Sequence, residues 1–456
     1  MDDEILIPAS LFFIKYDHVQ KSQMDEKRLT IKQKLYALIL CSVVFMMVYN
    51  GAAWYISTLA EVPSFVFDFE KHIPFIPWTI IPYMTSGLFF CMVFFLCNST
   101  EQLKVLTQRM LFVTIVAGIC FLLFPLQFSF SKPETGNLFF GYSFQFLKAF
   151  DSPFNQAPSL HIAYAFIFWS VFRNIKKGKI FIMLWLILLG ISTLTTYQHH
   201  FIDIITGTLV AHISFILFPY RKRDFRYRNF QVANYYFLLG WMLILTALLL
   251  NQFSGYPGLF FLWPALMMLF IGYHYQKNNI YFLKNQNGNI PWIRKIFYSP
   301  YLLMYQGLWK FLRKNKNPIE PTPHLYISSR PDHDIVERFT INKNIFIYDL
   351  SPEIEEISFL KGQSSYHFHP IMDIGSFDIE DTQKLVTEIS EQYKHLPKDG
   401  KILIHCTMGF TRSSVIGILV IKNILSLPLE EAITTMKISN KNMIIHSYLQ
   451  DFLKKI

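Results

Sequence analysis

The sequence predicts a polytopic α-helical membrane domain of about eight spans, followed by a C-terminal α/β domain with a mostly parallel central sheet. Hydrophobic residues make up 52% of the 456 residues, charged residues only 16%, and 46 residues are Phe. A soluble protein of this length does not need so much apolar surface, so much of the chain is expected in lipid. The apolar excess ends near residue 275, where charged residues and short strand and helix patterns begin.

The first part of the chain predicts a tail and a series of membrane spans. Residues 1–33 are polar and end in a basic cluster, which indicates a cytoplasmic tail. The next apolar run is too long for the core of a signal peptide and lacks a cleavage site. About 20 apolar residues cross a bilayer. By that measure the membrane domain, residues 34–275, holds spans near 35–59, 77–98, 110–128, 159–173, 180–198, 202–218, 234–252 and 258–275.

Loop charges predict how these spans are oriented. The loops after the second, fourth and sixth spans carry Lys and Arg, whereas 60–76 has three acids and one Lys and 251–257 has no charge. Basic loops stay in the cytoplasm. Both termini and the C-terminal domain are then cytoplasmic in a multi-pass plasma (inner) membrane protein. The same rule accounts for the net charge of +10, so no nucleic-acid partner is inferred from it.

Two polar stretches interrupt the membrane domain, 157–161 at the start of the fourth span and 197–203 at the start of the sixth. Ionisable residues at membrane depth are functional candidates. On the predicted topology both stretches lie at the outer face, so His161 and His199 can meet. Asp203 lies one helical turn after His199 and can hold its imidazole in one tautomer, which makes the other nitrogen a better nucleophile.

These stretches resemble two motifs of the PAP2 (lipid phosphate phosphatase) superfamily. Pro-Ser-x-His matches at Pro158, Ser159 and His161, and His-x-x-x-Asp matches at His199 and Asp203. The second motif reads Gln-His-His-Phe-Ile-Asp at 198–203 and has no leading Arg, so it looks more like the sphingomyelin and inositolphosphorylceramide synthase branch. The resemblance implies that His199 attacks phosphorus, Asp203 orients it and His161 protonates the leaving group.

The match to that family departs at its basic positions. An Arg is expected six residues before the nucleophile, where this chain has Thr193. The family's first motif is not recognisable, although 124–127 or Lys132-Pro133 stands roughly where it belongs. Lys132 is then the only nearby cation for a phosphate. Hydrolysis is expected to be weak, or the reaction to be headgroup transfer. A membrane half that is an inert anchor, with structural histidines, is the alternative.

The linker, residues 276–320, mixes aromatic and basic residues at 292–297 and 302–316. This pattern predicts an amphipathic helix on the anionic inner leaflet. A helix that packs on the soluble domain is the alternative. The domain that follows, residues 321–456, is expected to contain strands at 324–328, 344–350, 366–370 and 401–404 and helices at 381–395, 413–425, 429–437 and 446–455.

The chain has five cysteines, and only Cys406 lies in the soluble part. No spacing suggests disulfides or a metal site, and no cofactor is predicted. Cys406 stands in a loop between a buried strand and a helix that opens at Ser413, with Arg412 six positions on. Such a loop can aim backbone N–H groups at an anion. The helix dipole and Arg412 are expected to lower the pKa of Cys406, and Ser413 can hydrogen-bond the sulfur.

The pattern His-Cys-x-x-Gly-x-x-Arg-Ser resembles the signature of cysteine-dependent protein tyrosine and dual-specificity phosphatases. The resemblance implies a phosphocysteine intermediate, with His405 as structural support. It also implies that the loop binds phosphate. The loop residues concerned are Thr407, Met408, Gly409, Phe410, Thr411 and Ser413. The variable positions carry no Lys or Arg, which disfavours inositol polyphosphates as substrates.

The same resemblance implies an aspartic acid that protonates the leaving oxygen. Asp373, 33 residues upstream of Cys406, stands in a loop of the expected kind. Asp378 and Asp381 are its rivals, and either could simply cap the helix that follows. The order of the two halves resembles a group of bacterial inner-membrane phosphatase fusions. The sequence therefore predicts a membrane-bound phosphatase that acts on a phospholipid or a phosphoprotein in contact with membrane lipid.

Overall fold

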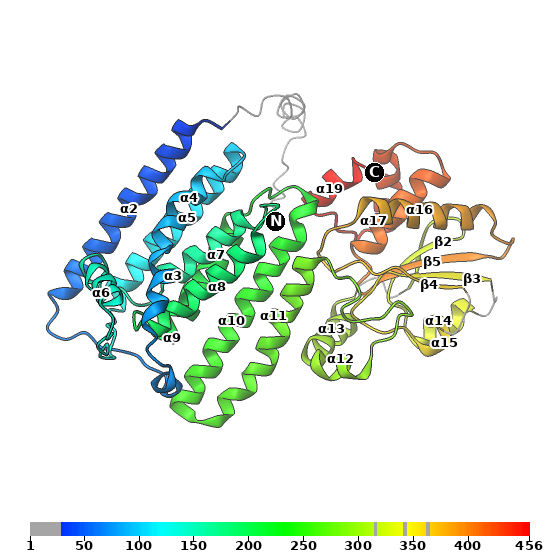
Figure 1. Cartoon of the computed structure of the whole chain (residues 1–456). Coiled ribbons are helices and arrows are strands. Elements are labelled where there is room, and N and C mark those ends of the chain that lie inside the picture. Colours follow the sequence, from blue (N-terminus) through cyan, green and yellow to red (C-terminus); the bar gives the residue numbers. More distant parts are fainter. Residues whose placement is uncertain (1–28, 314–316, 341–343, 362–364) are drawn as a thin grey trace, which may run out of the picture. The chain divides into compact units, whose positions relative to one another are not determined.

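The computed structural model describes residues 29–313, 317–340, 344–361 and 365–456 (Figure 1). The chain divides into two compact units, Met1–Tyr220 and Arg221–Ile456, called here the N-terminal unit and the C-terminal unit. Most of the predicted cytoplasmic tail, residues 1–28, lies outside the described residues. The boundary between the units falls inside the predicted membrane domain, so the last two predicted spans belong to the C-terminal unit.

The N-terminal unit is helical. Its α-helices are α2 (Ile31–Ser57), α3 (Ile80–Met84), α4 (Ser86–Phe95), α5 (Thr100–Leu123), α6 (Leu138–Phe150), α7 (Leu160–Phe172), α8 (Lys179–Thr195) and α9 (Phe201–Leu217). Two short 3-10 helices, η2 (Asp68–His72) and η3 (Pro77–Thr79), precede α3.

Helix occupies each of the eight predicted spans. Five stretches of the described chain are long and apolar enough to cross a membrane: Ile31–Ser57, Pro77–Phe95, Thr100–Leu123, Phe225–Ser254 and Tyr256–Lys277. The helices α7, α8 and α9 are apolar but have only 13, 17 and 17 residues. The five long helices fit a membrane protein, while eight crossings stay a prediction.

The third span differs from its expected bounds. The hydropathy pattern predicts a start near residue 110, with Lys104 and Arg109 in the loop before it, but α5 begins at Thr100 and contains both. The polar residues of its first turns hide the start of the helix. Arg109 is buried and donates to the carbonyl of Phe218, at the end of α9, at 3.0 and 2.8 Å. Its charge thus stabilises a helix C-terminus instead of marking a loop.

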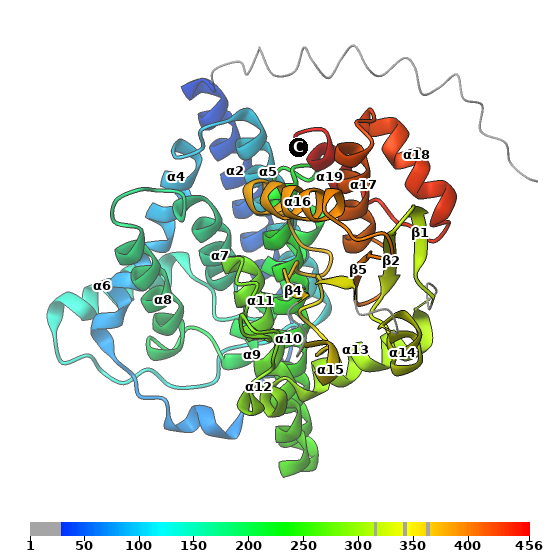
Figure 2. The same cartoon turned by 90° about the vertical axis from the view of Figure 1, so that its right-hand side faces the viewer.

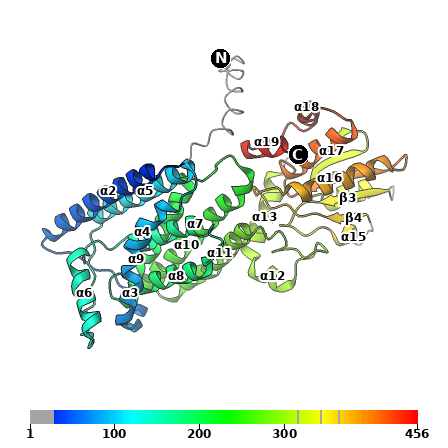
Figure 3. The ribbon, with the colours of Figure 1, turned by 45° about the horizontal axis from the view of Figure 1, so that its top comes forward.

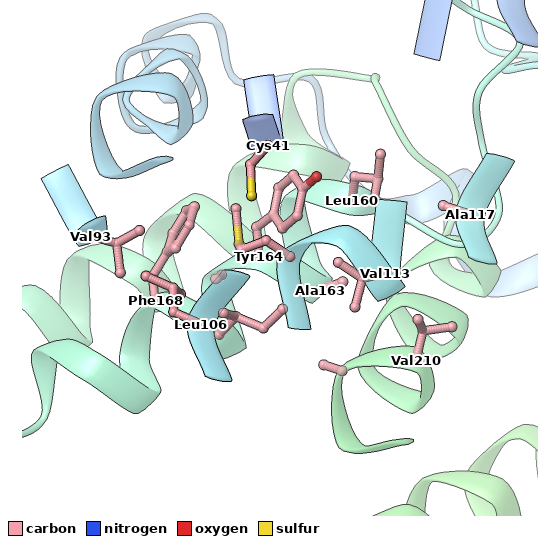
Figure 4. Close-up of a cluster of buried hydrophobic side chains, with 14 of the residues drawn as sticks. Cys41, Val93, Leu106, Val113, Ala117, Leu160, Ala163, Tyr164, Phe168 and Val210 are labelled. Atoms are coloured by element: carbon pink, nitrogen blue, oxygen red, sulfur yellow. The ribbon is translucent and has the colours of Figure 1, made fainter. Parts of the chain in front are cut away.

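The core of the N-terminal unit joins α5 to α2, α7 and α9. Figure 4 shows side chains from α2, α4, α5, α7 and α9 meeting in one cluster around Tyr164 and Phe168. The N-terminal end of α7 lies close to the second turn of α9. A Cβ on Gly207 would be only 2.5 Å from the carbonyl oxygen of Ser159, so the close approach requires glycine there. The Ser159 N–H also donates to the Asp203 carbonyl at 3.0 Å. The starts of α7 and α9, which carry the histidine motifs, therefore lie side by side.

The C-terminal unit begins with a helical hairpin. It consists of η4 (Phe225–Tyr227), α10 (Arg228–Ser254), η5 (Tyr256–Phe261) and α11 (Leu262–Lys277). Two shorter helices follow, α12 (Trp292–Phe297) and α13 (Ser299–Leu312). The remaining helices are α14 (His333–Thr340), α15 (Ser358–Lys361), α16 (Ile379–Lys394), α17 (Arg412–Ile424), α18 (Leu429–Ser439) and α19 (Ser447–Leu453).

The sheet of this unit has the order β1-β2-β5-β3-β4. Its strands are β1 (Ile319–Thr322), β2 (Leu325–Ser329), β3 (Ile345–Asp349), β4 (Tyr366–Phe368) and β5 (Lys401–Cys406). The pairs β2–β5, β5–β3 and β3–β4 are parallel and β1–β2 is antiparallel. The predicted mostly parallel sheet is confirmed, with β5 in its centre. The edge strand β1 is not among the predicted strands.

Helices cover both faces of this sheet. Ile402 and Ile404 of β5 face the helices α16 to α19, whereas Leu403 packs with Val336 of α14 and Leu360 of α15. Figure 2 shows α16, α17 and α18 on one side of the strands and α14 and α15 on the other. This alternation is the period of two that a strand buried on both faces requires. The C-terminal end of β5 is thereby held in the middle of the unit.

The predicted linker is built into the C-terminal unit. Tyr301, Leu302 and Tyr305 of α13 are buried in a core that includes Ile271 and Tyr275 of α11. The same core includes Ile354 and Met372, so this face of α13 packs on the predicted soluble domain as well as on α11. The last residues of the predicted 302–316 segment, 314–316, lie outside the described residues.

Lys284, also in the linker, is fully buried and donates to Asp349 Oδ2 at 2.8 Å and to the Ser351 carbonyl. The Tyr366 hydroxyl reaches the same carboxylate at 2.7 Å. Burial acts to raise the pKa of Asp349, but Lys284 and its other partners outweigh it and hold that pKa below its ordinary value. A segment between the α10–α11 hairpin and the sheet therefore completes the charge balance of the sheet's carboxyl edge.

We expect Lys284→Met to destabilise the C-terminal unit by about 3–5 kcal/mol, because it leaves the Asp349 carboxylate buried without its cation. Thermal unfolding of the full chain in detergent measures the change. Lys384→Met is the matched control, since Lys384 is exposed and its contact with Asp381 is 3.9 Å; an equal loss in both variants would contradict the role of Lys284.

Candidate active sites

The loop between β5 and α17 surrounds the sulfur of Cys406, the last residue of β5. The Gly409 N–H donates to the sulfur at 3.3 Å, and the Ser413 hydroxyl lies 3.4 Å from it. Both contacts place the sulfur at the N-terminus of α17, where free N–H groups and the helix dipole favour an anion. Gly409 has φ +76°, and a Cβ there would lie 2.6 Å from the Ser329 nitrogen. Only glycine fits this position.

The other predicted phosphate-binding residues are part of the same loop but form no hydrogen bond with the sulfur among the described residues. Thr407 is buried, and Met408, Phe410 and Thr411 are half-buried. The Phe410 carbonyl accepts a hydrogen bond from the Ile444 N–H at 3.1 Å, and Thr411 is the cap residue before α17.

The guanidinium of Arg412 is buried and held by several acceptors. Its Nη1 donates to both oxygens of Glu353 at 3.0 Å and to the Ile371 carbonyl at 2.9 Å. Its Nη2 lies 3.3 Å from Asp373 Oδ1 and 3.3 Å from Thr407 Oγ1. Burial acts to lower the pKa of Arg412, but Glu353 and Asp373 outweigh it and hold that pKa well above its ordinary value. The fork is therefore charged and fixed in orientation before any substrate arrives.

Sequence reasoning missed Glu353. Its carboxylate also accepts hydrogen bonds from the hydroxyls of Thr407 at 2.6 Å and Ser351 at 3.2 Å. Burial raises the pKa of Glu353, and Arg412 opposes that rise. One signal could have found it: Glu353 lies four residues after the end of β3, and the carboxyl ends of parallel strands meet at one edge, where such sheets bind ligands.

Asp373 lies beside Arg412, as the resemblance implies for the acid. Its side chain is 29% exposed, and its Oδ2 accepts a hydrogen bond from Tyr305 of α13 at 2.9 Å. The rivals lie elsewhere. Asp378 is the N-cap of α16 and accepts from the Asp381 N–H at 3.0 Å, and Asp381 is exposed beside Lys384. The structure therefore brings only Asp373, of the three, to the cradle.

His405 lies directly beneath the loop, fully buried. Its Nε2 is 3.3 Å from Glu356 Oε2 and its Nδ1 is 3.8 Å from Asp349 Oδ1. Burial lowers the pKa of His405, although the two carboxylates oppose this. The three side chains are close enough to hold a metal ion, as are His367, His369 and Glu388. Lys284 already balances Asp349, so His405 fits the predicted supporting role.

The N-terminal unit brings its two histidine motifs together. The rings of His161, at the start of α7, and His199, just before α9, have centroids 5.7 Å apart. His199 Nδ1 is 3.1 Å from Asp203 Oδ2, and the same oxygen accepts the His200 N–H at 2.9 Å. The remaining nitrogen of His199 is thereby left for another partner. The backbone of His199 is fixed by the Thr193 carbonyl, which accepts its N–H at 3.0 Å.

A cavity of about 260 Å³ reaches both histidines. Its walls come mainly from apolar side chains of α2, α4 and α7, among them Phe45, Phe90 and Tyr164. Such a cavity suits an acyl chain, with the histidines at its polar end.

Sequence reasoning missed the polar partners of this site. Asp151 accepts hydrogen bonds from the hydroxyls of Tyr49 and Tyr83, and the Tyr83 ring stacks on His161 at 4.3 Å. His200 pairs with Glu70 Oε2 at 3.0 Å. Both acids come from segments between predicted spans, and Glu70 counts among the loop acids of the orientation argument. Nothing in their spacing marks them, because they approach through the tertiary fold alone.

The predicted cation does not join the histidines. Lys132 is exposed, and the described residues show no hydrogen bond or ion pair from any Lys or Arg to His161 or His199. The nearby stretch 124–127 is tied to another loop, because Gln127 donates through its backbone to Pro63 and through its side chain to Val62.

A family model and several solved structures are similar to parts of this chain. A model of the PAP2 superfamily matches residues 78–217. That segment is similar to the PAP2 superfamily. It contains both histidine motifs and ends just before the boundary between the units. No curated protein matches the chain.

Several solved structures are similar to part of the chain. The active form of Tk-PTP shares 19% identity over 30% of this chain and 94% of that chain, with a TM-score of 0.27. Human DUSP28 shares 12% over 31% and 94%, with a TM-score of 0.26. PTPMT1 in complex with PI(5)P shares 13% over 30% and 93%, with a TM-score of 0.25.

We expect Gly409→Ala to lower turnover of a generic aryl phosphate by at least about 100-fold. The new Cβ meets the Ser329 backbone and the left-handed conformation itself costs about 1–2 kcal/mol, so the N–H aimed at Cys406 must move. Steady-state kinetics of the full chain in detergent measure the effect. The control is Gly307→Ala on α13, where a Cβ has open space; equal activities in the two variants would contradict the importance of this loop geometry.

Proposed function

We propose that this protein is a membrane-bound phosphatase with two phosphate-handling sites, and that its C-terminal unit hydrolyses phosphomonoesters through Cys406. One observation carries this proposal. A cysteine sulfur, a backbone N–H and a fixed, buried guanidinium converge at a helix N-terminus, with a carboxylic acid on the same guanidinium. Such a centre binds a phosphate dianion and offers both a nucleophile and an acid.

The geometry supports a two-step reaction. Arg412 and the loop N–H groups hold the non-bridging oxygens, and the Cys406 thiolate attacks phosphorus. The bond from phosphorus to the ester oxygen breaks as Asp373 gives that oxygen a proton, and the alcohol leaves. Water then attacks the phosphocysteine, Asp373 accepts its proton, and inorganic phosphate leaves. Ser413 stabilises the departing thiolate.

The two carboxylates on Arg412 differ in exposure, because Glu353 is buried whereas Asp373 is partly exposed. A phosphate dianion therefore displaces Asp373 from the guanidinium while Glu353 keeps the fork oriented. The freed Asp373 carboxylate takes up a proton from solvent and then lies next to the leaving oxygen as its acid.

For the N-terminal unit we propose that His199 attacks the phosphorus of a lipid phosphate, Asp203 orients it and His161 protonates the leaving group. The PAP2 match supports phosphoester hydrolysis, and the contact of His199 with Asp203 supports the roles. The alternative is an inert anchor or a lipid headgroup transferase, which is favoured because no Lys or Arg in the described part of the chain forms a hydrogen bond or ion pair with these histidines. Loop charges support a cytoplasmic C-terminal unit and an outward-facing histidine site. The substrates are phospholipids or phosphoproteins, with no nucleic acid.

Replacing the nucleophile tests the C-terminal site. Cys406→Ser is expected to lower aryl phosphate turnover by at least about 1,000-fold at neutral pH, because a hydroxyl is a far weaker nucleophile than a thiolate. Cys91→Ser is the control, since Cys91 is exposed on α4. Full activity in Cys406→Ser would overturn the assignment.

The histidine site is tested by His199→Ala in the Cys406→Ser background, with phosphatidic acid in detergent micelles as substrate. Consumption is expected to fall to background, because the nucleophile is gone, while His72→Ala in the same background keeps it. Release of phosphate and lipid mass spectrometry separate hydrolysis from headgroup transfer. Unchanged consumption in His199→Ala would favour the inert anchor.

A further inference from the structure

The loop that carries Asp373 is tied to the ends of the two hairpin helices. The Tyr275 hydroxyl of α11 donates to the Asp373 carbonyl at 2.8 Å. Arg228, the first residue of α10, donates to the Ile374 carbonyl at 2.9 Å. Ser376 exchanges hydrogen bonds with Asn229 at 2.7 and 3.2 Å. The acid loop therefore sits at the end of α10 and α11 that carries the hairpin's basic residues.

One residue of this loop is strained. Ile374 has φ +48°, which a β-branched residue rarely adopts. Such a conformation persists only where surrounding contacts impose it. Here the contacts on either side of Ile374 come from helices long and apolar enough to span a membrane. The position of the acid is thus set by the membrane hairpin as well as by the sheet.

The apolar surface of the hairpin continues onto α12. Trp292, Ile293 and Ile296 of α12 are 70%, 61% and 60% exposed. The ring of Phe297, at the end of this helix, meets Phe270 of α11 with centroids 5.5 Å apart. Figure 3 shows α12 beside α11. The exposed apolar residues of α11 on this stretch are Trp263, Leu266, Phe270 and Tyr273. The two helices together present one apolar surface.

The last carbonyl of α12 has a hydrogen-bond donor within the protein and does not need water. The Trp263 indole donates to the Phe297 carbonyl at 3.0 Å, so α11 satisfies a carbonyl that helices normally leave to solvent. The polar side of the segment is kept on the protein, since Lys295 pairs with Glu355 at 2.5 Å. These features fit contact of the exposed face of α12 with the lipid around the hairpin.

The acid loop lies at the basic end of the hairpin. Tyr275, which donates to the Asp373 carbonyl, is two residues before Lys277 at the end of α11, and Arg228, which donates to the Ile374 carbonyl, is the first residue of α10. The basic ends of a membrane hairpin lie in the headgroup layer, which is about 5–7 Å thick in one leaflet. The cradle is therefore held at the level of lipid phosphates.

We propose that the Cys406 site acts on a phospholipid with a terminal phosphate in the leaflet at which α11 ends, rather than on a phosphoprotein. This rests on the proposed function. A lipid phosphate already lies at the required depth, whereas a phosphorylated side chain would have to descend into the headgroup layer.

The test uses the full chain with His199→Ala, which silences the other proposed site, in sealed phosphatidylcholine vesicles. Phosphatidic acid is placed either in the vesicles that hold the protein or in separate ones. We expect at least about 10-fold faster phosphate release from lipid in the same vesicles, and its loss with Cys406→Ser. Equal rates from the two vesicle populations, or turnover of a phosphotyrosine peptide without turnover of the lipid, would overturn the proposal.

A soluble aryl phosphate in the same vesicles separates the two levels of inference. If it is hydrolysed and the lipid is not, only the substrate class fails; if neither is hydrolysed, the phosphatase proposal fails as well. Ile296→Glu, which puts a charge on the exposed face of α12, should lower lipid turnover about 5-fold or more and change aryl phosphate turnover less than 2-fold. Ile438→Glu on α18, where Ile438 is 72% exposed, is the matched control. Equal effects of the two substitutions on lipid turnover would also count against the proposal.

Discussion

The candidate site of the C-terminal unit depends on the buried guanidinium of Arg412. Taking such a charge out of water is costly unless carboxylates and hydrogen bonds compensate it. Glu353 supplies that compensation from the end of β3, and Asp373 adds to it from the loop after β4. Three segments distant in sequence are thereby brought to one point above the centre of the sheet. The same charge that assembles the site is the one that a phosphate would meet.

The N-terminal unit uses the same logic with different groups. A carboxylate on α9 orients the imidazole of His199, and the close packing at Gly207 brings α7 and its His161 against it. In this unit helix packing brings the polar residues together, whereas in the other unit the ends of the strands do so. The difference lies in the cation, since no Lys or Arg among the described residues contacts these histidines. Phosphate binding in this unit would have to draw on histidines and neutral donors.

The residues predicted from sequence are those whose spacing is short. Cys406, Gly409 and Arg412 lie within one loop, and His199 and Asp203 lie one turn apart, so local geometry alone places them together. Asp151 and Tyr305 reach their sites through tertiary packing, which a single sequence does not encode in any periodic pattern, and Glu353 is signalled only by its place after β3. The hydropathy pattern predicted the helices well but misplaced the start of α5, because the first turns of α5 are polar and its Arg109 is buried against the C-terminal end of α9. It also treated the linker as separate, because nothing local shows that Lys284 is buried.

The burial of Lys284 determines where the C-terminal unit can be divided without losing contacts of its sheet. A cut just before β1 would leave the sheet looking complete, yet Asp349 would lose its ammonium partner and Asp373 its two tyrosines. A fragment that keeps these contacts has to begin before α10 and include the apolar hairpin of α10 and α11. The apparent border before β1 is therefore not the border of the packed unit, which begins at Arg221.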